Sequence, residues 1–273
     1  MTQTMMARNR ILALLFGPLL GLVAGTGAWA DPVKCGDRPI LLGFYENGFL
    51  YDKGVGINQD IVEELRNRSG CRFATKVMTR ARIWADLASG DLDMSVSGLK
   101  TAERDTLFWF LDYMRMKTYA IVHNDVASRV QSAREFLHQT RLQIGVVSSL
   151  KYGRTHDSWL EQLRLADRVQ ETPEVESIFR KLQSHRVDVV FAQPPVYRKY
   201  LRDLAMDNLV EVQDWSPEEK GQSYGLVLSR SRYDAMDVEQ WRALMEEMKR
   251  EGVLRTIFLK YLPAKDADAM LSE

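Results

Sequence analysis

The sequence predicts an α/β protein with two related lobes, each built on a mainly parallel sheet covered by helices. Short apolar segments alternate with amphipathic segments in the order β-α-β-α-β, which is typical of parallel sheets. This order occurs twice, in residues 39–96 and again in residues 141–191. In both sets a leucine stands six residues before the aspartate that opens the third strand, at Leu87 and Leu182. The repeat indicates two lobes of similar construction.

The first set has clear boundaries for its helices. Asn58 is the predicted N-cap of the first helix, and Gly70 is its predicted stop. The set comprises, in order, strand 39–45, helix 57–70, strand 72–78, helix 80–90 and strand 92–96.

The second set follows the same plan. Thr172 as N-cap with Pro173 at the first helical position opens its second helix. The set comprises strand 141–147, helix 152–163, strand 168–171, helix 173–185 and strand 187–191.

The C-terminal tail adds one more strand, residues 223–229, and closing helices. Their predicted apolar side includes Met236, Trp241, Leu244 and Met248. A tail of this size would be orphaned as a third domain, so we expect it to complete the first lobe. The chain would then cross between lobes near 115–119 and 214–223. Lobe 1 would comprise residues 31–116 and 223–273, and lobe 2 residues 117–222, with the ligand site in the cleft between them.

The first thirty residues resemble a secretory signal peptide. Arg8 and Arg10 precede an apolar segment, residues 11–25, and a small-x-small site ends at Ala30. The alternative is a membrane anchor, but the apolar segment is shorter than the ~20 residues that a spanning helix needs. We therefore predict cleavage after Ala30 and export to the periplasm.

Charge and cysteine content agree with an exported small-molecule binder. Removing the signal segment takes away two basic and no acidic residues, which leaves a net charge of −2 and argues against nucleic-acid binding. The two cysteines, Cys35 and Cys71, precede the first two strands of one β-α-β unit. Export favours a disulfide between them over two free thiols, and two cysteines alone make a poor zinc site.

Polar and aromatic side chains follow the strands at the edge where ligands bind in open α/β sheets. A guanidinium fork binds a carboxylate through two charge-assisted hydrogen bonds, and N–H groups of a glycine turn add donors. Of the two arginines after the second strand, Arg80 and Arg82, we assign Arg82 to the site. The predicted site residues are Tyr45, Glu46, Arg82, Ser97, Gly98, Thr101, Arg104, Ser149, Lys151, Tyr152 and Gln193. The alternative for Arg104 is a surface role, and for Phe108-Trp109-Phe110 we favour core packing over a role in the site.

Segments along essentially the whole mature chain resemble the bacterial extracellular solute-binding proteins, family 3. Among them are GFYENGFLY (43–51), LASGDLDMSVSGLKTAERDTLFWFLDY (87–113) and VDVVFAQPPVYRKYL (187–201). The resemblance implies a type II periplasmic binding protein with two five-stranded sheets joined by a two-strand hinge. It also implies that Arg104 binds a ligand carboxylate and that residues 149–152 close on the ligand.

Two departures from the family pattern concern the ligand. The turn between Gly98 and Thr101 is one residue shorter than usual, and Gln193 stands where amino-acid binders carry an aspartate. An amide cannot form a charge pair with an α-ammonium group. Either Glu46 substitutes for that aspartate, or the ligand is not an α-amino acid.

The resemblance implies a monomeric receptor that delivers a small solute to an ABC permease, without cofactor or metal. An enzyme on the same scaffold, such as a dehydratase, is one alternative, and a sensing subunit for a membrane receptor is another. The sequence has no Gly-x-Ser-x-Gly motif, and its four histidines lack metal-ligand spacing. Neighbouring genes would separate transport from sensing.

Overall fold

The computed structural model describes residues 1–2 and 33–272. Apart from the first two residues, the predicted signal segment lies outside this range, as does its cleavage site after Ala30. Within the described residues, none of the helices combines the length and the apolar character needed to cross a bilayer.

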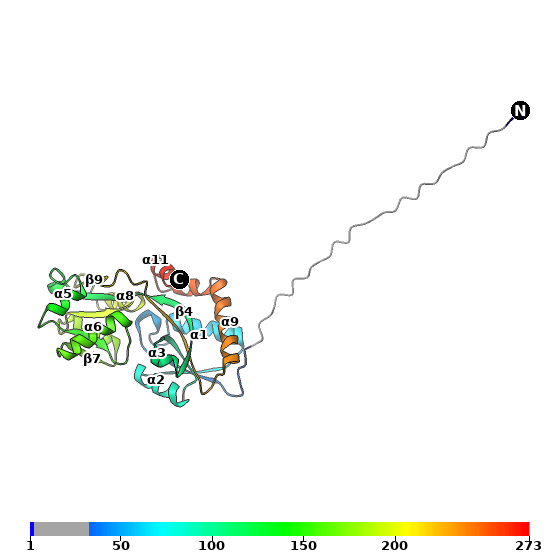
Figure 1. Ribbon diagram of the computed structural model, residues 1–273, viewed down its shortest axis with the longest axis horizontal. Helices are drawn as coiled ribbons and strands as arrows, with labels where there is room; N and C mark the ends of the chain where they lie inside the picture. The colour runs from blue at the N-terminus through cyan, green and yellow to red at the C-terminus, as the bar shows by residue number, and fades with distance from the viewer. Residues whose placement is uncertain (3–32, 273) are drawn as a thin grey trace. The chain divides into compact units, whose positions relative to one another are not determined.

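The first sheet has the strand order β2-β1-β3-β10-β4. Its edge strand β4 is labelled in Figure 1, between helices α3 and α9 of the same lobe. Strands β1, β2 and β3 are parallel, and β10 runs antiparallel to its two neighbours β3 and β4. The strands are β1 (Ile40–Phe44), β2 (Phe73–Val77), β3 (Met94–Leu99), β4 (Phe108–Met116) and β10 (Gln222–Ser229). The helices of this lobe are η1 (Gly48–Leu50), α1 (Ile57–Ser69), α2 (Arg80–Ser89), α3 (Ala102–Asp105), α9 (Ala235–Arg250), α10 (Val253–Leu259) and α11 (Ala264–Ala269).

The second sheet repeats this plan with the order β7-β6-β8-β5-β9, in which β5 is the antiparallel strand. Its strands are β5 (Tyr119–His123), β6 (Ile144–Val147), β7 (Val169–Thr172), β8 (Val189–Ala192) and β9 (Val210–Gln213). Its helices are α4 (Asn124–Ala127), α5 (Ala133–His138), α6 (Arg154–Leu165), α7 (Val175–Gln183) and α8 (Pro194–Asp203). Two five-stranded sheets flanked by helices confirm the predicted fold class.

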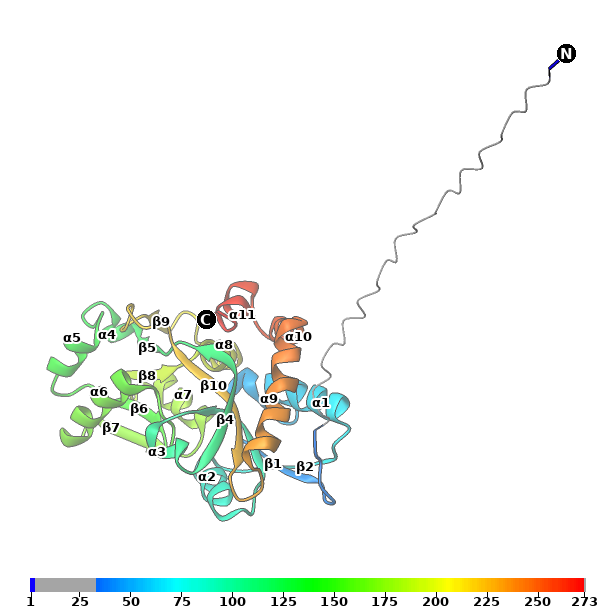
Figure 2. The same ribbon diagram turned by 45° about the vertical axis from the view of Figure 1, so that its right-hand side comes forward.

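Each antiparallel strand enters its sheet from the other lobe. Strand β4 of lobe 1 leads through residues 117–118 into β5, and β9 of lobe 2 leads through residues 214–221 into β10. Strands β4 and β10 lie side by side along their whole length (Figure 2). The two connections therefore leave and enter lobe 1 next to each other.

Strand β4 is an element that the sequence patterns did not predict. Its residues Phe108 and Phe110 are buried and Trp109 packs against the core, which confirms the core-packing alternative for these aromatics. Apolar and polar residues do not alternate regularly in residues 108–116. The reason is that the strand is buried on both faces at most positions. A segment buried on both faces reads as a continuous apolar run.

Two predicted helix starts were wrong. Helix α1 begins at Ile57 after Gly56, whose φ of 143° suits glycine, so Asn58 lies inside the helix with a buried side chain. Helix α7 begins at Val175, because the Thr172 hydroxyl accepts a hydrogen bond from the Glu174 N–H in the preceding turn.

The predicted apolar side of α9 is correct for Trp241 and Met248, which are fully buried. Met236 was assigned to this side wrongly, because it lies in the first turn and is exposed. Val238 and Met245 complete the buried stripe at helical spacing.

The predicted disulfide is present. Cys35 and Cys71 are joined with their Cα atoms 5.1 Å apart. They precede the paired strands β1 and β2, whose register begins at Ile40 opposite Phe73. The bridge therefore ties together the ends of both strands that lie away from the cleft.

Candidate functional site

A cleft of about 380 Å³ is lined by residues of both lobes. Lobe 1 contributes the segments that follow β1 and β2, and lobe 2 contributes the segment that follows β7. The lining residues include Tyr45, Glu46, Asp52, Thr79 and Arg80 of lobe 1, and Val147, Glu174, Glu176 and Tyr200 of lobe 2. The carboxyl ends of parallel strands therefore face the cleft, as expected for this class of sheet.

Tyr45 and Arg80 line the cleft on the lobe 1 side. Tyr45 directly follows β1, and its hydroxyl donates a hydrogen bond to the Ser97 carbonyl at 3.2 Å. Arg80 is the first residue of α2, which Thr79 caps through a hydrogen bond from the Arg82 N–H. The Arg80 guanidinium lies 3.7 Å from the centre of the Tyr45 ring, a cation–π geometry.

Arg104 lies in α3, where Thr101 is the N-cap and accepts the Arg104 N–H at 3.2 Å. Its guanidinium lies over the Trp84 ring, 3.9 Å from the ring centre. It donates to the Leu99 carbonyl at 3.2 Å and, across the lobes, to the Ser149 carbonyl at 3.2 Å. Burial, followed by the nearby charge of Arg80, lowers the pKa of Arg104 to about 10.

Ser97 and Gly98 lie inside β3, which extends to Leu99, and not in a turn after the strand. The Ser97 hydroxyl donates to Asn58 Oδ1 at 2.9 Å, and its N–H donates to the Tyr113 hydroxyl at 2.8 Å. Gly98 packs so closely that an added Cβ would lie 2.0 Å from a methyl group of Val227. Both residues therefore support the base of the site through contacts within lobe 1.

The second-lobe loop brings a backbone carbonyl, and not a side chain, to Arg104. Ser149 has a φ of 62° and presents its carbonyl oxygen to that arginine. Lys151 is exposed. Tyr152 is buried, and its hydroxyl accepts the Val147 N–H at 3.1 Å within lobe 2.

Gln193 lies where the two lobes meet. It is buried at the start of α8, and its amide donates to the Thr118 hydroxyl at 3.2 Å and to the Tyr224 hydroxyl at 3.3 Å. Thr118 lies between β4 and β5, and Tyr224 lies in β10. The amide therefore links lobe 2 to the first interlobe connection and to strand β10 of lobe 1 without adding a charge.

Glu46 and Arg82 lie apart from the contacts around Arg104. Glu46 is exposed at the rim of the cleft and accepts the Lys53 N–H at 3.2 Å. Partial desolvation of its carboxylate raises its pKa. Arg82 is exposed and pairs with Asp86 at 2.6 Å.

Helix α2 explains why Arg80 lies in the cleft and Arg82 does not. Arg80 and Trp84 are four residues apart and share one face of the helix, whereas Arg82 and Asp86 share another. The buried side of α2, which includes Ile83, packs on the sheet and so fixes how the helix is rotated about its axis. Helical periodicity was the sequence signal that would have favoured Arg80.

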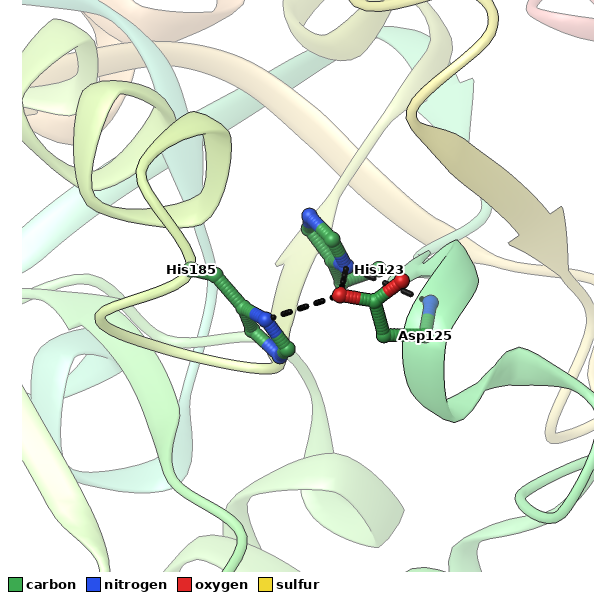
Figure 3. A group of neighbouring side chains, drawn as sticks. All are labelled: His123, Asp125 and His185. Atoms are coloured by element: carbon green, nitrogen blue, oxygen red, sulfur yellow. Dashed lines mark hydrogen bonds and ion pairs between the residues drawn. The ribbon is translucent and has the colours of Figure 1, made fainter.

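A separate cluster joins His123, Asp125 and His185 (Figure 3). Among the described residues, this is the group whose potential metal-ligand atoms all lie within 4.8 Å of one another. The two rings are stacked, with centroids 3.9 Å apart and an angle of 6° between their planes, so their in-plane lone pairs do not converge on one point. His123 Nδ1 also accepts the Asp125 N–H, and the two His185 nitrogens face Asp125 and Asp188 at 3.1 and 2.9 Å. The geometry is that of a histidine pair between carboxylates. Sequence spacing could not reveal it, because the histidines lie far apart along the chain.

Known proteins resemble the chain over most of its length. A family model described as bacterial extracellular solute-binding proteins, family 3, matches residues 42–264. No curated protein matches the chain. Similar solved structures include an ancestral arginine-binding protein bound to arginine (21% identity, 82% of this chain and 98% of that chain, TM-score 0.69). They also include an ancestral amino-acid-binding protein described as a precursor of cyclohexadienyl dehydratase (20% identity, 82% and 96%, TM-score 0.67). A third is a histidine kinase sensor domain with similarity to periplasmic binding proteins (14% identity, 82% and 96%, TM-score 0.69). At these identities the likeness concerns the fold.

Proposed function

Because the chain belongs to the bacterial extracellular solute-binding proteins, family 3, we propose that it is a periplasmic receptor for a small carboxylate-bearing solute. The solute binds in the cleft between the lobes and is delivered to an ABC importer. In this proposal the exported protein is a monomer, and its partners are the solute and an inner-membrane permease.

One observation carries the proposal. The half-buried Arg104 guanidinium spans the two lobes, and the hydrogen bonds that the described residues offer it come from the carbonyls of Leu99 and Ser149. A neutral carbonyl only partly offsets the desolvation of a guanidinium, whereas a carboxylate offers two charge-assisted bonds. A ligand carboxylate at this position would contact both lobes at once.

The proposed mechanism is closure of the lobes around the solute. Residues 117–118 and 214–221 serve as hinges because they are the two connections between the sheets. A ligand that contacts both lobes stabilises the closed state by its differential affinity for that state. Gln193 lies beside both connections and bonds to Thr118 and Tyr224, so its hydrogen bonds are sensitive to closure.

Isothermal titration of the refolded, disulfide-bonded protein tests the proposal. The panel contains polar amino acids, opines, short carboxylic acids and polyamines. Arg104→Ala is expected to weaken binding of the best acid by roughly 2–4 kcal/mol, because it removes a buried charge pair. Arg242→Ala is the matched control, since Arg242 is exposed on α9 and pairs with Glu239. Unchanged affinity in Arg104→Ala would remove this residue from the site.

The same experiment distinguishes a receptor from an enzyme. A receptor releases its solute unchanged, so chromatography after overnight incubation is expected to recover every bound acid intact. Turnover of a prephenate-like acid would instead favour the dehydratase alternative. A sensing role would use the same bound state and is tested separately, by whether an adjacent gene encodes a permease or a receptor kinase.

A further inference from the structure

Two nitrogen donors on helix α2 of lobe 1 lack a hydrogen-bond acceptor within the described part of the chain. Arg80 Nε and Trp84 Nε1 are buried and have no hydrogen-bond partner among the described residues. Both belong to one face of α2, and Trp84 lies under the Arg104 guanidinium. Leaving buried donors unpaired costs about 1–3 kcal/mol each, so the arrangement indicates an acceptor-bearing ligand.

The charges in this region are also unbalanced. Arg80 is 7% exposed, and within the described part of the chain neither it nor Arg104 forms an ion pair. By contrast, the exposed Arg82 on the same helix pairs with Asp86 at 2.6 Å. The charge of Arg80 is one of the causes that lower the pKa of Arg104. Two neighbouring guanidinium groups therefore lie near the cleft without an ion-pair partner among the described residues.

The acidic groups nearby do not supply the missing charge. Asp157 accepts the Tyr152 N–H at 3.0 Å, burial raises its pKa, and among the described residues it forms no ion pair with Arg80 or Arg104. Glu46 accepts the Lys53 N–H at the cleft rim. Gln193 is neutral and is occupied by two hydroxyl groups.

We propose that Arg80 and Arg104 bind the ligand jointly and that the ligand carries two negative charges. The chemical class is a small dianion, either a dicarboxylate or a compound with a phosphoryl or phosphonate group. Tyr45 fixes the spacing of the two arginines, since its ring lies under Arg80 and its hydroxyl bonds to the strand that leads to Arg104. This inference rests on the proposed function and adds the charge of the solute to it.

Isothermal titration with matched acids tests the inference. The probes are dicarboxylates of four to six carbons, the monoamide of each, and the corresponding phosphonocarboxylic acids. For the wild-type protein, the best dianion is expected to bind at least about tenfold more tightly than its monoamide. Arg80→Gln is expected to abolish that preference, because it weakens binding of the dianion more than binding of the monoamide. Arg104→Gln is expected to weaken both classes, and Arg242→Gln neither.

The variants also compare the two arginines of α2 directly. Arg82→Gln is expected to leave the dianion preference intact, and a loss in Arg82→Gln but not in Arg80→Gln would overturn the assignment. Arg80→Lys keeps the charge without the fork, so it is expected to retain part of the preference. Circular dichroism and melting curves establish that each variant is folded.

The outcomes separate this inference from the proposed function. If monoamides bind the wild type as tightly as dianions, the ligand is a monoanion, and the inference fails while the receptor function stands. If no acid binds the wild type, or if Arg104→Gln leaves the affinity for the best acid unchanged, the carboxylate-binding function itself fails. A preference for phosphonates over dicarboxylates supports the dianion and identifies its chemical source.

Discussion

Lowering the pH from 7 to 5 is expected to destabilise the fold through one histidine, His156. This residue of α6 is 1% exposed and contacts the rings of Trp159 and Phe191. The centroid of each of these rings is 4.9 Å from the centroid of the imidazole. Within residues 33–272 neither ring nitrogen has a hydrogen-bond partner, and the carboxylate oxygen of Glu219 that faces the ring is 3.9 Å away. Burial, only partly offset by Glu219, lowers the pKa of His156 to about 4.

The sign and size of the effect follow from this pKa. The unfolded chain takes up the proton near pH 6.5, whereas the folded protein keeps the ring neutral down to about pH 4. Burial of the neutral His156 ring therefore costs no stability above pH 6.5. As the pH falls from 6.5 toward 4, protonation of the unfolded chain lowers the free energy of unfolding. Linkage gives a loss of about 2 kcal/mol between pH 7 and pH 5, and roughly 3 kcal/mol in full.

Urea unfolding of the wild type and of His156→Gln at pH 7, 6 and 5 measures this contribution. The wild type is expected to lose about 2 kcal/mol more than the variant over this range. Comparing the two proteins cancels the titration of other groups. His138→Gln, at an exposed position of α5, is the control and is expected to follow the wild type. Equal losses in wild type and His156→Gln would refute the reasoning.

Three further predictions concern stability. Replacing both Cys35 and Cys71 by serine opens a loop with a sequence separation of 36; we expect a loss of about 4 kcal/mol, seen as a lower melting temperature. Gly98→Ala places a Cβ 2.0 Å from a Val227 methyl group and is expected to cost about 1–3 kcal/mol in urea unfolding; wild-type stability would show that β3 and β10 can separate freely. Asp93→Asn removes the charge of a buried carboxylate that pairs at 2.6 Å with the half-exposed Arg38, and calorimetry is expected to show a loss of about 1–3 kcal/mol.

Much of the architecture could be predicted because local sequence patterns determine most of its strands and helices. Alternating apolar segments and helical stripes predicted the strands around Leu42 and Val189, and export predicted the disulfide from two cysteines. Strand β4 escaped because double-sided burial removes alternation from residues 108–116. The short strand β9 escaped because it lies at a sheet edge, where its middle residues are exposed.

The sequence by itself determined which residue types follow each strand, and so the chemical character of the site. Only the tertiary structure decided which of them meet. Arg104 reaches the carbonyl of Ser149, 45 residues away, and the Gln193 amide of lobe 2 donates to the Tyr224 hydroxyl in strand β10 of lobe 1. Arg80 faces the cleft because the packing of α2 on its sheet sets the rotation of the helix. Local sequence encodes backbone conformation and polarity, whereas the direction of a side chain depends on contacts between elements distant along the chain.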